Sequence, residues 1–352
     1  MLHFEIHKSL NDTCKHAWRE LEKKSNYNFF QSYDYIKEII VKSEIKAANI
    51  IIIYDNKEVI ALLPFEIKKY FGFKVLQWIG TKKSDYCNPI IANNFYRNVD
   101  KKNFLKLWNA ITKNLDNFNL FFFNNQLSKI EKIENPFIKY FKTTAFSESF
   151  QIKLPDTFED YKRIIREKDK KHFYEIHRTS IKLDNLKKNF EVKFYIDNLT
   201  NAELSLKEII KSKIKQLKIE KKKHNLNIDF IDIYEKLNNL NNHNFIIAKL
   251  QVDNKIVSAC FGIVYKNIFY YFIPILLTNN YSNFKIGKIL LLKIIDWCIS
   301  RKIKVFDFGL GAEKYKKYFS NSSTILHRYI HFKNFKGFFL FIFLRIIFYF
   351  KS

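Results

Sequence analysis

Three β-like runs in close succession constrain the fold more than any other feature of this 352-residue sequence. They cover residues 245–252, 255–265 and 268–276, and only Asp253-Asn254 and Lys266-Asn267 separate them. Polar two-residue links of this kind join antiparallel strands in hairpins. The segment therefore predicts a three-stranded antiparallel meander.

A helix and a further strand follow the meander, and the N-terminal half repeats this order. Apolar residues at Ile289, Leu292, Ile295 and Ile299 have helical spacing, and a short β-like run follows them. In the N-terminal half, three β-like runs likewise precede a helical pattern and an apolar run. Residues 55–61 also match residues 253–259 at five of seven positions. The repeated order favours a duplicated α/β domain.

The net charge of +26 admits phosphate-bearing partners but does not identify one. The lysines are spread along the whole chain, and the densest window, 162–223, has 19 basic and 9 acidic residues. This pattern fits either a solvated basic surface or a surface that binds phosphates.

The cysteines and the N-terminus indicate a cytoplasmic protein. The four cysteines are far apart and lack metal-type spacing, so we expect reduced, packed thiols. No apolar stretch has signal-peptide length at the N-terminus, and no segment reaches the roughly 18 apolar residues of a membrane-spanning helix.

Two of the seven glycines, Gly309 and Gly311, lie in FDFGLGAEKYKKYF at 306–319. A strand that ends near Asp307 and turns at glycine can bring backbone N–H groups and a carboxylate to one point. The stretch fits neither the P-loop nor the three-glycine dinucleotide fingerprint. Both a structural turn and a ligand site are compatible with it.

Lys285, Gly287 and Lys288 begin the helix that follows the meander. Unpaired N–H groups, the helix dipole and two cations would suit a pyrophosphate at this point. An ordinary basic helix start is the alternative.

These motifs together resemble a known family. Y-x-x-F-K-x-G-K-x-L-L at 281–291 and F-D-F-G-x-G-x-x-x-Y-K-x-x-F at 306–319 look like the C-terminal domain of FemAB-like acyltransferases in the GNAT superfamily. The most similar branch is that of the cellulose-biosynthesis (CelD/BcsL) acetyltransferases. The resemblance covers about 157–320 with specific motifs and 1–150 more loosely.

The resemblance implies an α/β (α+β) fold with tandem GNAT-like domains, each a mixed, mostly antiparallel sheet flanked by helices. The implied ranges are 1–152 for an N-terminal GNAT-like domain, 153–335 for the acyltransferase domain and 336–352 for an apolar, basic tail. It also implies acyl-CoA, such as acetyl-CoA, as the co-substrate and no metal.

The resemblance assigns the donor site to Lys285, Gly287 and Lys288, where GNAT enzymes bind the pyrophosphate of acyl-CoA. The sequence departs from the usual GNAT loop at Ile289, where a second small residue is usual. Backbone N–H groups of residues 270–272 would polarise the thioester carbonyl.

The resemblance places the second motif at the acceptor side of the site. Asp307 or Glu313 is the candidate base, and Tyr315 is the candidate general acid. Each has a structural alternative, because Asp307 could cap the turn, Glu313 could be a solvated helix residue and Tyr315 could pack. The implied acceptor-binding residues are Gly309, Gly311 and Lys316, the last as a clamp for a carboxylate or phosphate.

Two further features have open interpretations. His327 and His331 are four residues apart, but HRYIHF alternates like a strand and no third metal ligand is evident. The apolar segment 337–350, with basic residues within and beside it, could pack on the domain or lie at the inner face of the cytoplasmic membrane.

Three function classes follow. The first is an N-acyltransferase that uses acyl-CoA and an amine-bearing small molecule or glycan precursor, in cell-envelope or exopolysaccharide biosynthesis. The second is a FemAB-like enzyme that transfers an amino acid from aminoacyl-tRNA to a peptidoglycan or lipid precursor. The third is a non-catalytic protein that binds nucleic acid or membranes.

Overall fold

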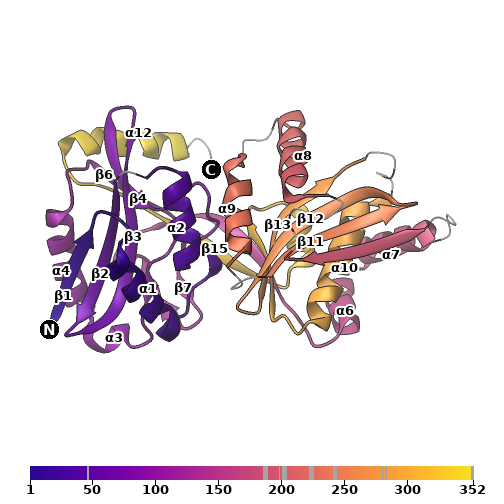
Figure 1. Ribbon diagram of the computed structural model, residues 1–352, viewed down its shortest axis with the longest axis horizontal. Coiled ribbons are helices and arrows are strands. Elements are labelled where there is room, and N and C mark those ends of the chain that lie inside the picture. The colour runs from indigo at the N-terminus through magenta and orange to yellow at the C-terminus, as the bar shows by residue number, and fades with distance from the viewer. Residues whose placement is uncertain are drawn as a thin grey trace. The chain divides into compact units, whose positions relative to one another are not determined.

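Figure 1 shows the computed structural model of the chain. It describes residues 1–45, 47–184, 189–197, 199, 204–221, 226–240, 244–278, 281 and 284–349. The chain divides into two compact units, which are described separately. Unit 1 comprises residues 1–147 and 325–352, and unit 2 comprises residues 148–324.

Unit 1 is a sheet with the strand order β1-β2-β3-β4-β6-β15, and helices pack on it. Neighbouring strands are antiparallel except β4 and β6, which are parallel. Its main elements are β1 (Leu2–His7), α1 (Asp12–Lys24), η1 (Phe29–Gln31), α2 (Tyr33–Lys42), β2 (Ala48–Asp55), β3 (Glu58–Tyr70), β4 (Phe73–Trp78), β5 (Ile90–Ile91), α3 (Phe95–Asn98), α4 (Lys101–Asn114), β6 (Leu120–Leu127), β7 (Lys129–Ile130), β8 (Ile133–Glu134), α5 (Pro136–Tyr140), β15 (Ser322–Phe332) and α12 (Phe335–Tyr349).

Unit 2 repeats this arrangement with the strand order β9-β14-β13-β12-β11-β10. Neighbouring strands are again antiparallel except one pair, β13 and β14. Its elements are β9 (Thr144–Lys153), α6 (Phe158–Lys168), α7 (Lys170–Asp184), β10 (Phe190–Ile196), α8 (Leu206–Ile219), α9 (Asp229–Asn238), β11 (Asn244–Val252), β12 (Lys255–Tyr265), β13 (Ile268–Leu276), α10 (Ile286–Ser300), β14 (Val305–Leu310) and α11 (Lys314–Phe319).

The predicted meander forms β11, β12 and β13. Its links adopt positive φ at both residues, with 49° and 63° at Asp253 and Asn254 and 48° and 60° at Lys266 and Asn267. Such pairs match the right-handed twist of the flanking strands and give tight hairpins. The predicted fold class, mixed and mostly antiparallel sheets flanked by helices, is confirmed.

The two units share one order of elements, in which a strand and two helices precede three strands, a helix and a strand. A sixth strand completes each sheet from another part of the chain. β9 lies beside β14 in unit 2, whereas β15 returns near the C-terminus to pair with β6 in unit 1. The domain ranges expected from the sequence, 1–152 and 153–335, do not include this return of the chain to the first sheet.

Helices cover both faces of the sheet in unit 2. On one face, α10 packs with Ile246, Ala248 and Leu250 of β11 in a buried core. On the other face, Tyr234 of α9 contacts the ring of Phe245. Since alternate residues of a strand point to opposite faces, a sheet buried on both sides explains the almost unbroken apolar sequence of β11.

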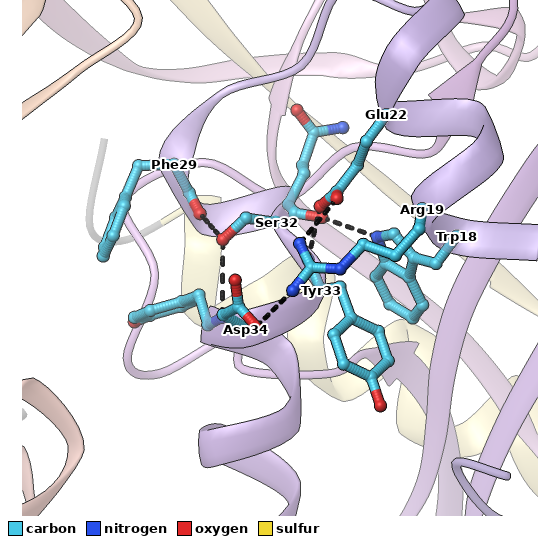
Figure 2. A network of polar contacts seen from close by, with 9 residues as sticks. Trp18, Arg19, Glu22, Phe29, Ser32, Tyr33 and Asp34 are labelled. Carbon is cyan, nitrogen blue, oxygen red and sulfur yellow. Dashed lines mark hydrogen bonds and ion pairs between the residues drawn. The ribbon is translucent and has the colours of Figure 1, made fainter. Parts of the chain in front are cut away.

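A polar network joins α1 to α2 in unit 1 (Figure 2). Arg19 donates to Glu22 Oε2 at 2.8 Å and to Asp34 Oδ1 at 2.5 Å. The other oxygen of Glu22 accepts from the backbone N–H of Tyr33, and the indole N–H of Trp18 donates to the carbonyl of Gln31. Both carboxylates are nearly buried, so the guanidinium that pairs them stabilises this junction.

Local signals at the helix ends agree with the sequence. Thr157 caps α6 by accepting from the N–H of Asp160, in agreement with the Thr-x-x-Asp pattern at this helix start. A second pattern of this kind, Thr200 to Glu203, also predicts a helix start from the sequence, and it lies outside the described residues. α8 begins after Ser205, which forms a capping box with Glu208. All four cysteines are free and buried.

Candidate active site

The parallel strands β13 and β14 separate within unit 2. Their pairing runs from Ile268–Val305 to Tyr270–Asp307 and ends there, although β13 continues to Leu276 and β14 to Leu310. Beyond Tyr270 and Asp307, backbone groups of both strands are therefore released from the pairing between β13 and β14.

A β-bulge lies at the same level of β13. Phe261 pairs with Ile273 and Gly262 pairs with Tyr271, so Phe272 is an extra residue on β13. A Cβ atom at Gly262 would lie 2.9 Å from the carbonyl oxygen of Tyr270. Only glycine allows this approach of the two strands, and the bulge reorients the backbone within the 270–272 segment where carbonyl-polarising N–H groups are expected.

The N-terminus of α10 carries no side-chain cap among the described residues. Its N-cap residue, Lys285, has a φ of +49°. The ammonium of Lys285 pairs with the carboxylate of Glu175 on α7, and Nζ of Lys288 lies 3.0 Å from Nε2 of His172. At Gly287, an added Cβ would lie 3.3 Å from a terminal methyl of Leu276, so a side chain fits here only with a small shift of that flexible methyl.

We refer to four residues as the donor cluster: His172, Glu175, Lys285 and Lys288. Contacts within the cluster shift the pKa of three of them. Burial, and then the charge of Lys285, lower the pKa of Lys288. Burial, and then the charge of Lys288, lower the pKa of His172. A neutral His172 can accept from Lys288 at Nε2 and donate from Nδ1 to Glu175, whose oxygen is 3.4 Å away. The hydrogen bond from Lys285 lowers the pKa of Glu175.

The turn after β14 uses both predicted glycines in conformations that favour glycine. Gly309 has a φ of +67° and Gly311 a φ of +116°. Asp307 is buried and accepts from the N–H of Gly309 at 2.7 Å and from Nε2 of Gln151 at 2.8 Å. The hydroxyl of Ser149 donates to the carbonyl of Gly309. Asp307 thus caps the turn, and β9 supplies the partners that hold it.

The remaining predicted residues lie on or beside α11. Lys316 is buried, donates to the carbonyl of Leu310 at 2.8 Å and pairs with Glu313 at 3.0 Å. Glu313 itself is about half exposed. The ring of Tyr315 packs edge-on against Phe308, and burial, followed by the charge of Glu313, raises the pKa of its hydroxyl. Tyr315 therefore keeps its proton at neutral pH, whereas Lys316 is engaged within the protein.

α11 connects the two groups of predicted residues. It carries Tyr315 and Lys316, and its Tyr318 ring lies edge-on to His172 at 4.1 Å. Sequence reasoning missed His172, Glu175, Gln151 and Tyr318, because their partners are distant in the sequence and no local motif marks them. The pairing of β9 with β14 could not be predicted from the sequence for the same reason.

The corresponding position of unit 1 differs chemically. β4 and β6 pair at Leu76–Phe121 and also stop pairing there. The long helix between these two strands in the chain, α4, is capped by Asp100, which accepts from the N–H of Asn103 at 2.7 Å. A carboxylate thus caps this helix end beside Lys101 and Lys102, whereas its counterpart in unit 2 has two lysines and no side-chain cap among the described residues.

A metal site is not evident in the part of the chain that the structure describes. No group of three or more His, Cys, Asp or Glu side chains there could hold an ion. His327 and His331 lie on β15 as a strand pattern predicts, and burial lowers the pKa of each.

Part of unit 2 matches a known family model. Residues 171–317 match the family model of the acetyltransferase (GNAT) domain. No curated protein shows significant sequence similarity to the chain.

Solved structures agree in fold. The crystal structure of FemX has a TM-score of 0.59 at 9% identity, covering 93% of this chain and 97% of FemX. L-PGS from Bacillus licheniformis has a TM-score of 0.52 at 12% identity, covering 98% and 97%. The C-terminal domain of a putative lysylphosphatidylglycerol synthetase from Agrobacterium fabrum has 0.51 at 9% identity, covering 91% of each chain. At these identities the similarity concerns the fold alone.

Proposed function

We propose that this chain, whose residues 171–317 match a GNAT acetyltransferase domain, is an N-acyltransferase that uses acyl-CoA as donor. The contrast between the two units carries the proposal. In unit 2, separating strands, a bulge at Phe272 and a helix start flanked by Lys285 and Lys288 occur together. In unit 1, Asp100 fills the corresponding helix end. Both helix starts carry two lysines, Lys101 and Lys102 on α4 and Lys285 and Lys288 on α10, so the difference lies in the cap. An anionic donor could bind the N–H groups at the start of α10, whereas the carboxylate of Asp100 already accepts from the start of α4.

The proposed reaction needs no covalent enzyme intermediate. The neutral amine attacks the thioester carbonyl carbon, a C–N bond forms and the C–S bond breaks. The amine loses a proton, and the departing thiolate of CoA gains one. Backbone N–H groups near the bulge at Phe272 would stabilise the negative charge that develops on the carbonyl oxygen.

The contacts of the side chains suggest how these roles are divided. Tyr315 is the favoured general acid, because a tyrosine hydroxyl carries its proton at neutral pH; burial raises its pKa further and makes it a weaker acid than a solvated tyrosine. Asp307 already accepts two hydrogen bonds, which favours a positioning role at the turn. Glu313 is the more accessible of the two candidate bases. Lys316 would bind an acceptor anion only by leaving Leu310 and Glu313.

The acceptor proposal is narrower and rests on the sequence motifs at 281–291 and 306–319. They resemble the cellulose-biosynthesis type of acetyltransferase, so we propose an amino sugar or another amine of a cell-envelope glycan precursor, with acetyl as the transferred group.

An aminoacyl-tRNA donor is the second candidate, and one crevice favours it. A crevice of about 410 Å³ lies between α6 and α7. Basic and aromatic side chains of this kind bind single-stranded nucleic acid through phosphate contacts and base stacking. The basic and aromatic lining residues are Lys162, Arg163, Arg166, Phe173, Tyr174 and His177. Glu159 and Asp160 also line the crevice and pair with Lys162 and Arg163.

Calorimetric titration of the full chain with acetyl-CoA and longer acyl-CoAs tests the donor. Gly287→Glu should abolish binding, since its carboxylate would repel the pyrophosphate. Gly287→Gln introduces a side chain of the same shape without the charge and should lose far less affinity for acyl-CoA. Saturable binding with this difference would support the proposal.

Absence of binding to every acyl-CoA by a folded sample would contradict the leading proposal. Titration with aminoacyl-tRNA then separates the other two classes. Affinity for RNA should fall steeply with salt and on replacing Arg163 and Arg166 by Gln. Absence of binding to both donors would favour a non-catalytic protein.

A further inference from the structure

The C-terminal helix α12 has an unpartnered apolar face on unit 1. Five large apolar side chains lie within about 100° of arc on a helix of 3.6 residues per turn. Between 41% and 76% of each residue is exposed: Phe335, Phe339, Ile342, Phe343 and Ile346. The basic residues Lys336 and Arg345 lie on opposite flanks of this stripe, and both are exposed. This pattern is typical of a helix that lies in a membrane interface.

The opposite side of α12 is seated on unit 1. Gly337 is buried there, and an added Cβ would collide with the backbone carbonyl of Asn119 at the start of β6. Asn334 accepts from the N–H of Gly337 and donates to the carbonyl of Phe118. Lys333 donates to the carbonyl of Thr112. These contacts hold α12 on the domain, so its outward face has a fixed position.

A second exposed aromatic residue lies beside this helix. Phe71, at the turn between β3 and β4, is 100% exposed and has a φ of +47°. A bulky residue rarely adopts positive φ at a fully solvated position. The ammonium of Lys336 lies 5.6 Å from the ring centre of Phe73, which places the turn next to α12. Figure 1 shows the β3–β4 turn projecting beside α12.

Charge around both features has one sign. Neither residues 325–352 nor residues 67–84 contain an Asp or Glu. Lys68, Lys69 and Lys74 are exposed next to the turn. Together with Lys336 and Arg345, they surround the apolar residues with positive charge. Such a surface would repel a second copy of itself and attract anionic headgroups.

We infer that the outer face of α12 and the β3–β4 turn together form a docking surface for anionic lipid bilayers. α12 lies in the plane of the interface with its apolar stripe toward the acyl chains. Phe71 inserts beside it, and the five basic residues contact headgroup phosphates. Within the described residues, no helix has the length and apolar character needed to cross a bilayer, which agrees with peripheral attachment. The surface lies in unit 1 and does not depend on the proposed acyl transfer.

Vesicle co-sedimentation of the full chain tests this inference. Vesicles of phosphatidylcholine with one third phosphatidylglycerol should bind at least tenfold more protein than pure phosphatidylcholine. Phe71→Ser and Phe343→Gln should each weaken binding several-fold, and the double variant should weaken it further. Val41→Gln and Ile219→Gln remove exposed apolar residues elsewhere and serve as controls, since they should bind like the unaltered chain.

A spectroscopic readout separates insertion from nonspecific adsorption. In a Phe71→Trp variant, tryptophan emission should shift to the blue on addition of anionic vesicles, because the new ring leaves water. Equal binding to both vesicle types, or binding unchanged by Phe71→Ser and Phe343→Gln, would overturn the inference. So would a dimer that Phe343→Gln dissociates in the absence of vesicle binding, since a second copy would then cover the face.

Discussion

Replacing Gly311 by alanine tests whether the turn after β14 sets the acceptor side of the site. A φ of +116° is outside the left-handed well that other residues occasionally enter, so we expect Gly311→Ala to cost about 3 kcal/mol of folding free energy. The added Cβ would also lie 2.7 Å from a carboxylate oxygen of Glu313 and displace it from the buried ammonium of Lys316.

Gly72→Ala is the matched control for this substitution. Gly72 has a φ of +83° and no heavy atom within 4 Å of an added Cβ, so alanine costs only the left-handed backbone, about 1 kcal/mol. Urea unfolding followed by circular dichroism measures both variants. Comparing Gly311→Ala/Glu313→Ala with Glu313→Ala separates the two causes, because both variants lack the ion pair with Lys316 and only the contact with the carboxylate is removed from the cost of Gly311→Ala.

The functional result should be a loss of turnover without a loss of donor binding. Gly311→Ala alters the turn that carries Asp307 and leaves the donor cluster unchanged, so kcat should fall at least tenfold while the acyl-CoA Kd stays within about twofold. Equal stability of Gly311→Ala and Gly72→Ala, together with unchanged kcat, would refute the reasoning.

Three further predictions address acid catalysis, donor charge and the unit 1 network. Tyr315→Phe should lower kcat by about 100-fold or more and leave the acyl-CoA Kd unchanged, because general acids contribute about 10²–10⁴-fold to the rate. A loss of kcat smaller than about threefold would exclude this role for Tyr315. Acyl-CoA should bind more weakly as pH rises, because burial and Lys285 lower the pKa of Lys288 and remove its charge at a lower pH than in free lysine. Calorimetry between about pH 8 and 10 checks this, and Lys288→Met should flatten the dependence. Arg19→Met should cost about 2 kcal/mol in urea unfolding, since Glu22 and Asp34 lose their partner at a partly exposed site.

Local sequence signals were sufficient for the hairpins and the turn glycines. Asp253-Asn254 and the Asn267 of the second link favour two-residue hairpins because Asp and Asn tolerate positive φ, and this property does not depend on distant contacts. Glycine likewise permits the positive φ that Gly309 and Gly311 adopt at the turn. Alternation and helical spacing therefore predicted the meander and the order of elements that follows it.

The environment of the site was decided by tertiary structure. Burial of Lys316 against the carbonyl of Leu310 turns an expected ligand clamp into an internal contact, and no sequence pattern distinguishes a lysine of this kind from a solvated one. Gln151 reaches Asp307 only because β9 completes the sheet of unit 2.

What the sequence determined by itself is local: the two hairpins, the glycine turn and the basic start of α10. Tertiary structure alone decided that Glu175 and His172 of α7 cover Lys285 and Lys288. It alone decided that β15 returns to β6. The physical reason is that these contacts join residues far apart in the chain, whose approach depends on burial and strand pairing summed over the whole unit.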